Sequence, residues 1–369
     1  MDHPLLPDEL RPGDGRFGSG PSKVRAEAAA ALAGAGVLGT SHRRPDVTGL
    51  VRRIREGFAA LFALPEGYEV LIGNGGATAF WDAASFSLIE RRSEHLVFGE
   101  FSAKFAAAVA AAPHLDDPVV VSSEPGTHPE PRADRSVDAY ALTHNETSTG
   151  VMMPVARPAA DGLVLVDATS AAGALAVDPS EFDVYYCSPQ KAFGADGGLW
   201  AACCSPAAVE RIESSTRWSP PFLDLRLALE SSRTDQTYNT PAVATLFLFA
   251  DQIDWLLERG GLPWAVGHGE RAASVVYGWA ETARYAAPFV ADPAARSRTV
   301  AAVDLIGVDA AALTAALRVN GIVDLEGYRK LGRNQIRIGM FPNVEIADLE
   351  RLVAAIDWMV PRLGGPGAA

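Results

Sequence analysis

An aspartate and a lysine each follow a short apolar run near the middle of the chain. The run 163–166 ends on Asp167, and the run 184–187 is followed, after three further residues, by Lys191. Apolar runs of this length, bounded by turn residues, predict buried strands of a parallel sheet. Because open α/β sheets bind ligands at the carboxyl ends of their strands, we expect Asp167 and Lys191 to lie near each other at that edge.

This pair has the chemistry that pyridoxal phosphate requires. A buried carboxylate at Asp167 would keep the pyridine nitrogen protonated, and the amine of Lys191 would hold the aldehyde as a Schiff base. The chain has four lysines, Lys23, Lys104, Lys191 and Lys330, and of these Lys191 alone follows a predicted buried strand. Coincidence alone can also place two such residues after two strands, so the assignment depends on finding a phosphate site as well.

A glycine-rich turn supplies a candidate phosphate site. The strand predicted over 69–73 is followed by the turn 74–76, by Ala77 and Thr78, and by a helix predicted over about 79–89. The start of a helix offers free backbone N–H groups and the positive end of the helix dipole to an anion. Turns of this kind are common, so the turn alone is weak evidence for a phosphate site. It becomes relevant because pyridoxal phosphate, which the carboxylate–lysine pair indicates, carries a phosphate.

Composition indicates a soluble globular protein. The 369 residues are 48% hydrophobic and 21% charged, and the net charge of −13 argues against nucleic acid as a partner. We see neither a signal-peptide pattern nor an apolar run long enough to span a bilayer, and therefore expect no membrane association. Three cysteines, two of them adjacent, give neither a disulfide framework nor metal-ligand spacing, so we expect a cytoplasmic protein without a metal site.

Alternating strand and helix patterns predict an α/β fold with a large and a small domain. The strands of the large domain are predicted over 69–73, 95–98, 118–122, 139–143, 163–167, 184–187 and 199–203. The segment 260–263, Gly-Gly-Leu-Pro, is the predicted junction. We therefore expect an N-terminal arm over 1–16, a large cofactor-binding domain over 17–260 and a small C-terminal α/β domain over 261–369.

The motifs, taken in order, resemble those of the phosphoserine aminotransferases, which are fold-type I enzymes of the class V aminotransferase group. The resemblance covers nearly the whole chain. It rests on Phe-Gly-Ser-Gly-Pro (17–21), Ser-His-Arg (41–43), Gly-Gly-Ala-Thr (75–78), Asn-Glu-Thr (145–147), Gln-Lys (190–191), Tyr-Asn-Thr-Pro (238–241) and Arg337 before Met-Phe-Pro-Asn (340–343). The segment 217–220 and the glycine turn resemble those of an actinobacterial branch of the family. The resemblance implies a mostly parallel seven-stranded sheet flanked by helices, and a homodimer with shared active sites.

The resemblance also implies which residues bind the cofactor. Lys191 would be the Schiff-base lysine and proton shuttle, Asp167 would pair with the pyridine nitrogen, and Thr147 would bond the ring hydroxyl. The residues implied for the cofactor phosphate are Ala77, Thr78 and Gln190, together with Asn239 and Thr240 of the other subunit.

Arginines are implied as the substrate ligands. Arg337 would bind the α-carboxylate, a planar bidentate task that suits a guanidinium group. His42 and Arg43, from the partner chain, and Arg329 would bind the phosphate of the substrate or the distal carboxylate of glutamate. Taken alone, His42 and Arg43 also fit a solvated segment that precedes a helix.

Two positions depart from the family's pattern. The family often stacks a tryptophan on the cofactor ring, and Phe101 takes that place here, although a core aromatic is the more frequent role for such a residue. The family's His-Arg pair near the C-terminus is Tyr328–Arg329 in this chain. Because Tyr328 can donate only a neutral hydrogen bond, the substrate phosphate site loses one potential positive charge.

The implied reaction is reversible amino transfer between L-glutamate and 3-phosphonooxypyruvate, which gives 2-oxoglutarate and O-phospho-L-serine in serine biosynthesis. The resemblance also allows 4-phosphooxy-L-threonine, on the route to pyridoxine, as a second substrate. An alanine–glyoxylate type of aminotransferase is an alternative, but a small neutral side chain needs no arginine cluster. A cysteine desulfurase-like lyase is another alternative. Its chemistry needs a mobile, exposed cysteine, but the cysteines of this chain lie in predicted strands. A cofactor-binding regulator would need an appended partner module.

Overall fold

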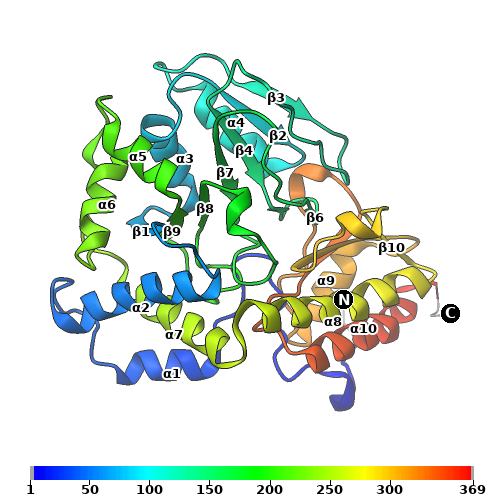
Figure 1. Ribbon diagram of the computed structural model, residues 1–369. Coiled ribbons are helices and arrows are strands. Elements are labelled where there is room, and N and C mark those ends of the chain that lie inside the picture. Colours follow the sequence, from blue (N-terminus) through cyan, green and yellow to red (C-terminus); the bar gives the residue numbers. More distant parts are fainter. Residues whose placement is uncertain (1–3, 367–369) are drawn as a thin grey trace.

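The computed structural model describes residues 4–366, and its centre is a seven-stranded sheet (Figure 1). The strand order is β1 (Glu69–Asn74), β9 (Leu199–Cys204), β8 (Val184–Cys187), β7 (Leu163–Asp167), β4 (Ala139–Thr143), β2 (Ser93–Val97) and β3 (Val119–Ser122). Strand β9 is antiparallel to both of its neighbours, and the other neighbouring pairs are parallel. The predicted mostly parallel seven-stranded sheet is thus confirmed.

Helices cover both faces of this sheet, because alternate residues of a strand point to opposite sides. Two neighbours on β7 show the alternation: Val166 belongs to one apolar cluster and Leu165 to the other. The cluster of Val166 includes residues of α1 (Ala26–Gly34), α2 (Pro45–Leu61) and α7 (Val243–Glu258). The cluster of Leu165 includes residues of α3 (Gly76–Ser87), α4 (Glu100–Ala110), α5 (Pro206–Ser214) and α6 (Leu225–Arg233).

Helix α3 begins three residues earlier than the sequence predicted. Glycine disfavours a helix interior, but Gly75 and Gly76 stand at the N-terminus of α3, where φ values of 103° and 69° suit residues without a Cβ. A Cβ on Gly75 would also lie 2.4 Å from the Cβ of Ala79. The two glycines therefore bring the first turn of α3 directly onto the end of β1.

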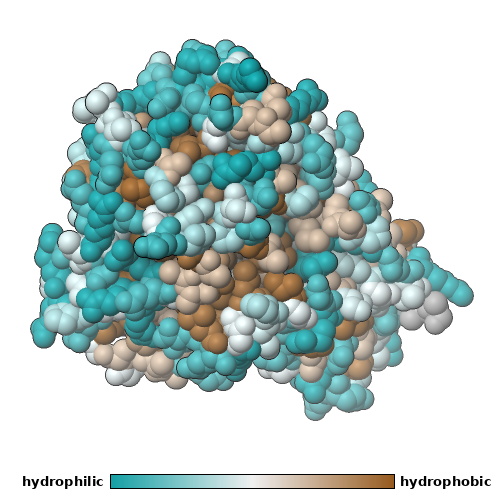
Figure 2. All heavy atoms as spheres, viewed as in Figure 1, coloured by the Kyte–Doolittle hydropathy of each residue, from teal (hydrophilic) through white to brown (hydrophobic). Residues whose placement is uncertain are grey.

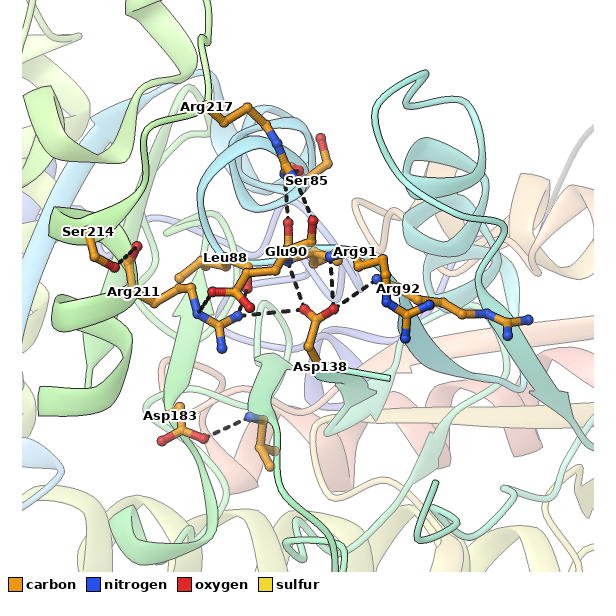
Figure 3. A network of polar contacts seen from close by, with 12 residues as sticks. Ser85, Leu88, Glu90, Arg91, Arg92, Asp138, Asp183, Arg211, Ser214 and Arg217 are labelled. Atoms are coloured by element: carbon orange, nitrogen blue, oxygen red, sulfur yellow. Dashed lines mark hydrogen bonds and ion pairs between the residues drawn. The ribbon is translucent and has the colours of Figure 1, made fainter. Parts of the chain in front are cut away.

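Side chains from elsewhere in the chain hold the C-terminal end of α3 (Figure 3). Arg217 donates hydrogen bonds to the carbonyl oxygens of Ser85, at 3.2 Å, and Ile89, at 2.7 Å. In the same network, Asp138 accepts three bonds from the backbone N–H groups of residues 90–92. Helix α3 has no basic residue in its own last turn, so Arg217 supplies the cation that complements the negative end of its dipole.

The C-terminal part of the chain forms a separate apolar cluster beside the large sheet (Figure 1). It contains an antiparallel sheet of β10 (Ala286–Pro288), β11 (Val300–Leu305) and β12 (Gln335–Gly339), with helices α8 (Gly261–Thr282), α9 (Ala310–Val319) and α10 (Ile346–Met359). Leu6 and Phe17 join this cluster, so the N-terminal segment packs against the C-terminal part. The domain limits at 16/17 and 260/261 stay a prediction.

The remaining elements are short. Strands β5 (Asn145–Glu146) and β6 (Val151–Met152) pair with each other shortly after β4. The 3-10 helices are η1 (Asp8–Leu10), η2 (Pro179–Glu181), η3 (Pro221–Leu223), η4 (Pro293–Ala295), η5 (Arg329–Leu331) and η6 (Val360–Leu363). Within residues 4–366, no helix has the length and apolar character needed to cross a membrane.

Candidate active site

A cavity of about 440 Å³ lies where the carboxyl ends of the parallel strands meet. Asp167, the last residue of β7, and Lys191, shortly after β8, both line it, so the structure brings the predicted pair together. The other predicted cofactor ligands that line the same cavity are Ala77, Thr78, Phe101, Thr147 and Gln190.

The carboxylate of Asp167 is buried and holds one hydrogen bond on each oxygen. Oδ2 accepts from the indole Nε1 of Trp81 at 3.1 Å, and Oδ1 accepts from the backbone N–H of Thr169 at 2.9 Å. Burial raises the pKa of Asp167, and the bonds from Thr169 and Trp81 act in the opposite direction. A buried carboxylate of this kind is stabilised by a cation in the cavity, such as a protonated ring nitrogen.

The amine of Lys191 is buried as well. Its Nζ donates a hydrogen bond to the carbonyl oxygen of Ser19 at 2.7 Å. Burial, with a further contribution from the nearby guanidinium of Arg337, lowers the pKa of Lys191 to about 7, although Asp167 and Glu146 act in the opposite direction. A large fraction of this amine is therefore neutral near pH 7, and a neutral amine is the form that attacks an aldehyde or removes a proton.

The first turn of α3 forms one wall of the cavity through Ala77 and Thr78. It carries no acidic residue and no side chain caps it, so its backbone N–H groups and dipole remain available to an anion. Gln190 and Thr169 also line the cavity, and each holds a buried side-chain oxygen without a hydrogen-bond partner in the described structure. The free N–H groups of the helix turn and the hydroxyl of Thr169 can donate to a phosphate, whereas the Gln190 oxygen can only accept, so the helix turn carries the fit to a phosphate next to a ring that Asp167 and Lys191 would hold.

Phe101 is held at the cavity wall by the buried carboxylate of Glu146. This carboxylate accepts hydrogen bonds from the backbone N–H groups of Phe101, at 3.1 Å, and Ser102, at 2.9 Å, in the first turn of α4. The centroid of the Phe101 ring lies 6.0 Å from Nζ of Lys191. Phe101 thus lines the cavity, and its stacking on a cofactor ring stays a prediction.

A second cavity, of about 450 Å³, adjoins the first, because Gly20 and Pro21 line both. Two of the predicted substrate ligands, Arg329 and Arg337, line this second cavity. Nη1 of Arg337 donates to the carbonyl oxygen of Thr147 at 3.1 Å, which links the arginine to a residue of the first cavity. The guanidinium group of Arg337 also lies 5.2 Å from the ring centroid of Tyr328.

The remaining predicted residues lie in neither cavity. His42, Arg43, Asn239 and Thr240 are absent from both linings. They cluster instead near the end of β1, where Nδ2 of Asn74 donates to Oδ1 of Asn239 at 2.6 Å and Thr240 Oγ1 lies 3.2 Å from Nδ1 of His42. Within a single chain, the structure does not bring this cluster to the cavity of Lys191.

Sequence reasoning missed Trp81, and although it singled out the motif 17–21, it did not foresee that Ser19 and Gly20 contact Lys191. Trp81 stands four residues after Ala77, on the same helical face, and this spacing was a usable signal. The segment 19–21 has no local signal of contact with Lys191, because the two are some 170 residues apart and meet through tertiary packing.

Comparisons with known proteins agree with this geometry. The family model described as aminotransferase class-V matches residues 24–352. A protein of Mycolicibacterium vanbaalenii is 57% identical over 97% of this chain and 98% of its own length. A Rhodococcus opacus protein named phosphoserine aminotransferase is 54% identical over 98% of this chain and 99% of its own length.

Among solved structures, a phosphoserine aminotransferase from Cytophaga hutchinsonii aligns with a TM-score of 0.86 and 23% sequence identity. The alignment covers 94% of this chain and 99% of the Cytophaga chain, so the two share their fold over nearly the whole of this chain. The extent of the family match and the level of identity to the relatives lead to one conclusion: the chain belongs to the aminotransferase class-V family.

Proposed function

We propose that the chain is a pyridoxal phosphate-dependent phosphoserine aminotransferase. Its reaction is reversible amino transfer between L-glutamate and 3-phosphonooxypyruvate, which yields 2-oxoglutarate and O-phospho-L-serine. The observation that carries the proposal is the junction of two cavities: one holds Asp167 and Lys191, and the other holds Arg329 and Arg337. The close relative in Rhodococcus opacus that bears this name supports it.

The first cavity supplies a partner for each part of the cofactor. When the cofactor is bound, Asp167 would pair with the ring nitrogen, Phe101 would stack on the ring and Thr147 would bond the ring hydroxyl, while Ala77 and Thr78 would present backbone N–H groups to the phosphate. When bound, pyridoxal phosphate supplies an aldehyde that carries the amino group and a ring that takes up the electrons released at the α-carbon.

The protein supplies proton transfer and substrate binding. Lys191, with its pKa lowered to about 7, removes the proton from the α-carbon of the substrate in its neutral form and returns a proton as ammonium. Arg337 binds the α-carboxylate of the substrate, so that the α-carbon lies within reach of Lys191. Because both substrates are anions, arginines rather than apolar side chains are needed next to the cofactor.

The cluster of His42, Arg43, Asn239 and Thr240 supports a homodimer with shared sites. These residues are half-buried or exposed and lie outside both cavities of their own chain, so we propose that they complete the phosphate sites of a second copy. Exposed aromatic side chains precede Asn239 and Thr240 in the sequence: Trp218 is 76%, Phe222 49% and Tyr238 44% exposed. The face in Figure 2 is largely hydrophilic with a hydrophobic patch near its centre, a pattern typical of association surfaces.

The rival chemistries of this fold have less support. A desulfurase-like lyase needs an exposed thiolate, but Cys187, Cys203 and Cys204 are all buried and free, and burial raises the pKa of each thiol. An alanine–glyoxylate aminotransferase has no anionic side chain on its substrate, so Arg329 of the second cavity would have no substrate group to bind.

A single half-reaction tests the proposal. Protein loaded with pyridoxal phosphate is mixed with O-phospho-L-serine, and the visible absorbance of the cofactor is followed, with L-alanine and L-cysteine as controls. We expect the absorbance to bleach with O-phospho-L-serine and to persist with both controls. Bleaching with L-alanine or L-cysteine but not with O-phospho-L-serine would contradict the substrate assignment while keeping the cofactor.

A further inference from the structure

The hydrogen bond between Trp81 and Asp167 points to a role that the motifs did not reveal. We propose that Trp81 is a positioning residue that keeps the Asp167 carboxylate ionised and oriented toward the ring nitrogen of the cofactor. This inference rests on the proposed function, because it concerns the same cavity.

The position of the Trp81 indole is fixed by its surroundings. Trp81 is 5% exposed, lines the first cavity and stacks on Phe105 of α4 with ring centroids 6.1 Å apart and an interplanar angle of 17°. Its backbone belongs to α3, one turn after Ala77, so one helix contributes both the proposed phosphate site and the donor to Asp167. The same helix thereby fixes the proposed phosphate site relative to the Asp167 carboxylate.

The indole N–H is the side-chain donor that the geometry assigns to this carboxylate. Oδ1 of Asp167 receives the backbone N–H of Thr169, and Oδ2 receives Nε1 of Trp81. The phenol of Tyr186 is buried near Asp167, but its hydroxyl group has no hydrogen-bond partner by distance and angle in the described structure. Loss of the indole N–H would therefore leave Oδ2 in a buried position without its donor.

The consequence for binding follows from charge. A buried carboxylate that loses a hydrogen bond takes up a proton more readily, and a neutral carboxyl group no longer stabilises a protonated ring nitrogen. The effect depends on the ring nitrogen and on nothing else in the cofactor. A cofactor analogue in which C–H replaces that nitrogen cannot carry the positive charge. Its affinity should therefore not depend on the indole N–H of Trp81.

The experiment compares two ligands with cofactor-free protein: pyridoxal phosphate and its 1-deaza analogue. Dissociation constants are measured by equilibrium dialysis for the wild type and for Trp81→Phe, which keeps an aromatic ring against Phe105 but has no N–H. We expect Trp81→Phe to bind pyridoxal phosphate about tenfold or more weakly, as for a lost hydrogen bond to a charged group, and to bind the 1-deaza analogue nearly as well as the wild type does.

Trp279 offers a matched control elsewhere in the chain. Its indole Nε1 donates to Oδ1 of Asp357 at 2.9 Å within the C-terminal cluster, and neither residue lines the two cavities. Trp279→Phe removes the same kind of bond, and we expect it to change neither dissociation constant. Should Trp81→Phe fail to fold, Trp81→Met takes its place, because methionine fills irregular space and also lacks the donor.

The outcomes separate the inference from the proposed function. Equal losses of affinity for both ligands would show that Trp81 merely shapes the cavity, and unchanged affinity for pyridoxal phosphate would show that the indole N–H is dispensable. Either result overturns the inference while leaving the proposed function intact. Failure of the wild type to bind either ligand would instead overturn the proposed function.

Discussion

The amine of Lys191 lies so close to Gly20 that a Cβ atom at residue 20 would stand 1.9 Å from Nζ. The same segment accepts the hydrogen bond from Nζ at the Ser19 carbonyl oxygen, and the backbone N–H of Ser22 donates to the Gln190 carbonyl oxygen at 2.8 Å. Gly20 has a φ of 148°, which residues with a side chain rarely adopt. The segment 19–22 therefore fixes where the lysine amine stands between the two cavities.

Gly20→Ala should displace the amine and also strain the backbone at residue 20, so urea unfolding must show that the variant is folded before its activity is compared. The nearest atoms to the added methyl group belong to the flexible end of Lys191, so the side chain can move, but it then leaves its place beside the cavity. Because catalytic groups misplaced by about 1 Å can cost roughly 100-fold in rate, we expect a loss of that order in kcat/KM for amino transfer.

Gly278→Ala is the control for this substitution, since residue 278 lies in α8 and a Cβ there meets nothing within 4 Å. It should keep full activity and stabilise the helix by about 0.5–1 kcal/mol. Wild-type activity in Gly20→Ala, measured by steady-state kinetics, would refute the positioning role of segment 19–22.

The pKa of Lys191 predicts how the stability of the cofactor-free protein depends on pH. The folded protein protonates this amine with a pKa of about 7, and the unfolded chain does so with the ordinary value of 10.5. Between these values the unfolded state binds more protons, so the contribution of Lys191 to the free energy of unfolding must rise with pH. The free energy of unfolding of the wild type should therefore rise relative to that of Lys191→Met, by up to about 1.4 kcal/mol per pH unit between about pH 7.5 and 9.

Urea unfolding at several pH values measures this difference. Lys104→Met, which removes an exposed lysine of α4, provides the baseline and should run parallel to the wild type. If the free energies of unfolding of the wild type and Lys191→Met differ by the same amount throughout this pH range, the buried amine keeps its ordinary pKa.

The sequence revealed those parts of the fold and site that depend on local patterns. Short apolar runs located strand β7, which ends on Asp167, and strand β8, which precedes Lys191, since a buried strand must be apolar whatever surrounds it. The start of α3 was misplaced, because glycine opposes helices on average yet suits the N-terminus of this one. The contacts of Trp81 with Asp167 and of Ser19 with Lys191 join segments 86 and 172 residues apart, and such contacts arise only from packing.

Arg43→Ala tests the proposed sharing of sites between subunits. Among residues 4–366, the side chain of Arg43 hydrogen-bonds only that of Gln236, at 2.9 Å in an exposed cluster, so the substitution should hardly alter stability. If Arg43 binds a substrate phosphate in the partner's site, O-phospho-L-serine should lose roughly 10- to 100-fold in kcat/KM, and unphosphorylated L-serine much less.

Both substrates are compared by steady-state kinetics, with Arg298→Ala as the control, because Arg298 forms an exposed ion pair with Glu270 and lines neither cavity. Equal losses for the two substrates would exclude a phosphate role for Arg43. If the wild type sedimented as a monomer under assay conditions, Arg43 could not act in the active site of a second subunit.

Arg217→Ala should show that α3 depends on a cation from outside the helix. Arg217 donates to several carbonyl oxygens at the C-terminal end of α3, including those of Ser85 and Ile89 (Figure 3). Removing the guanidinium group leaves these acceptors without their partner, so we expect the free energy of unfolding to fall by about 1–3 kcal/mol. Arg217→Lys, which keeps the charge but cannot span several acceptors, should recover part of this loss. Urea unfolding that showed Arg217→Ala to be as stable as the wild type would mean that water satisfies these carbonyl groups equally well.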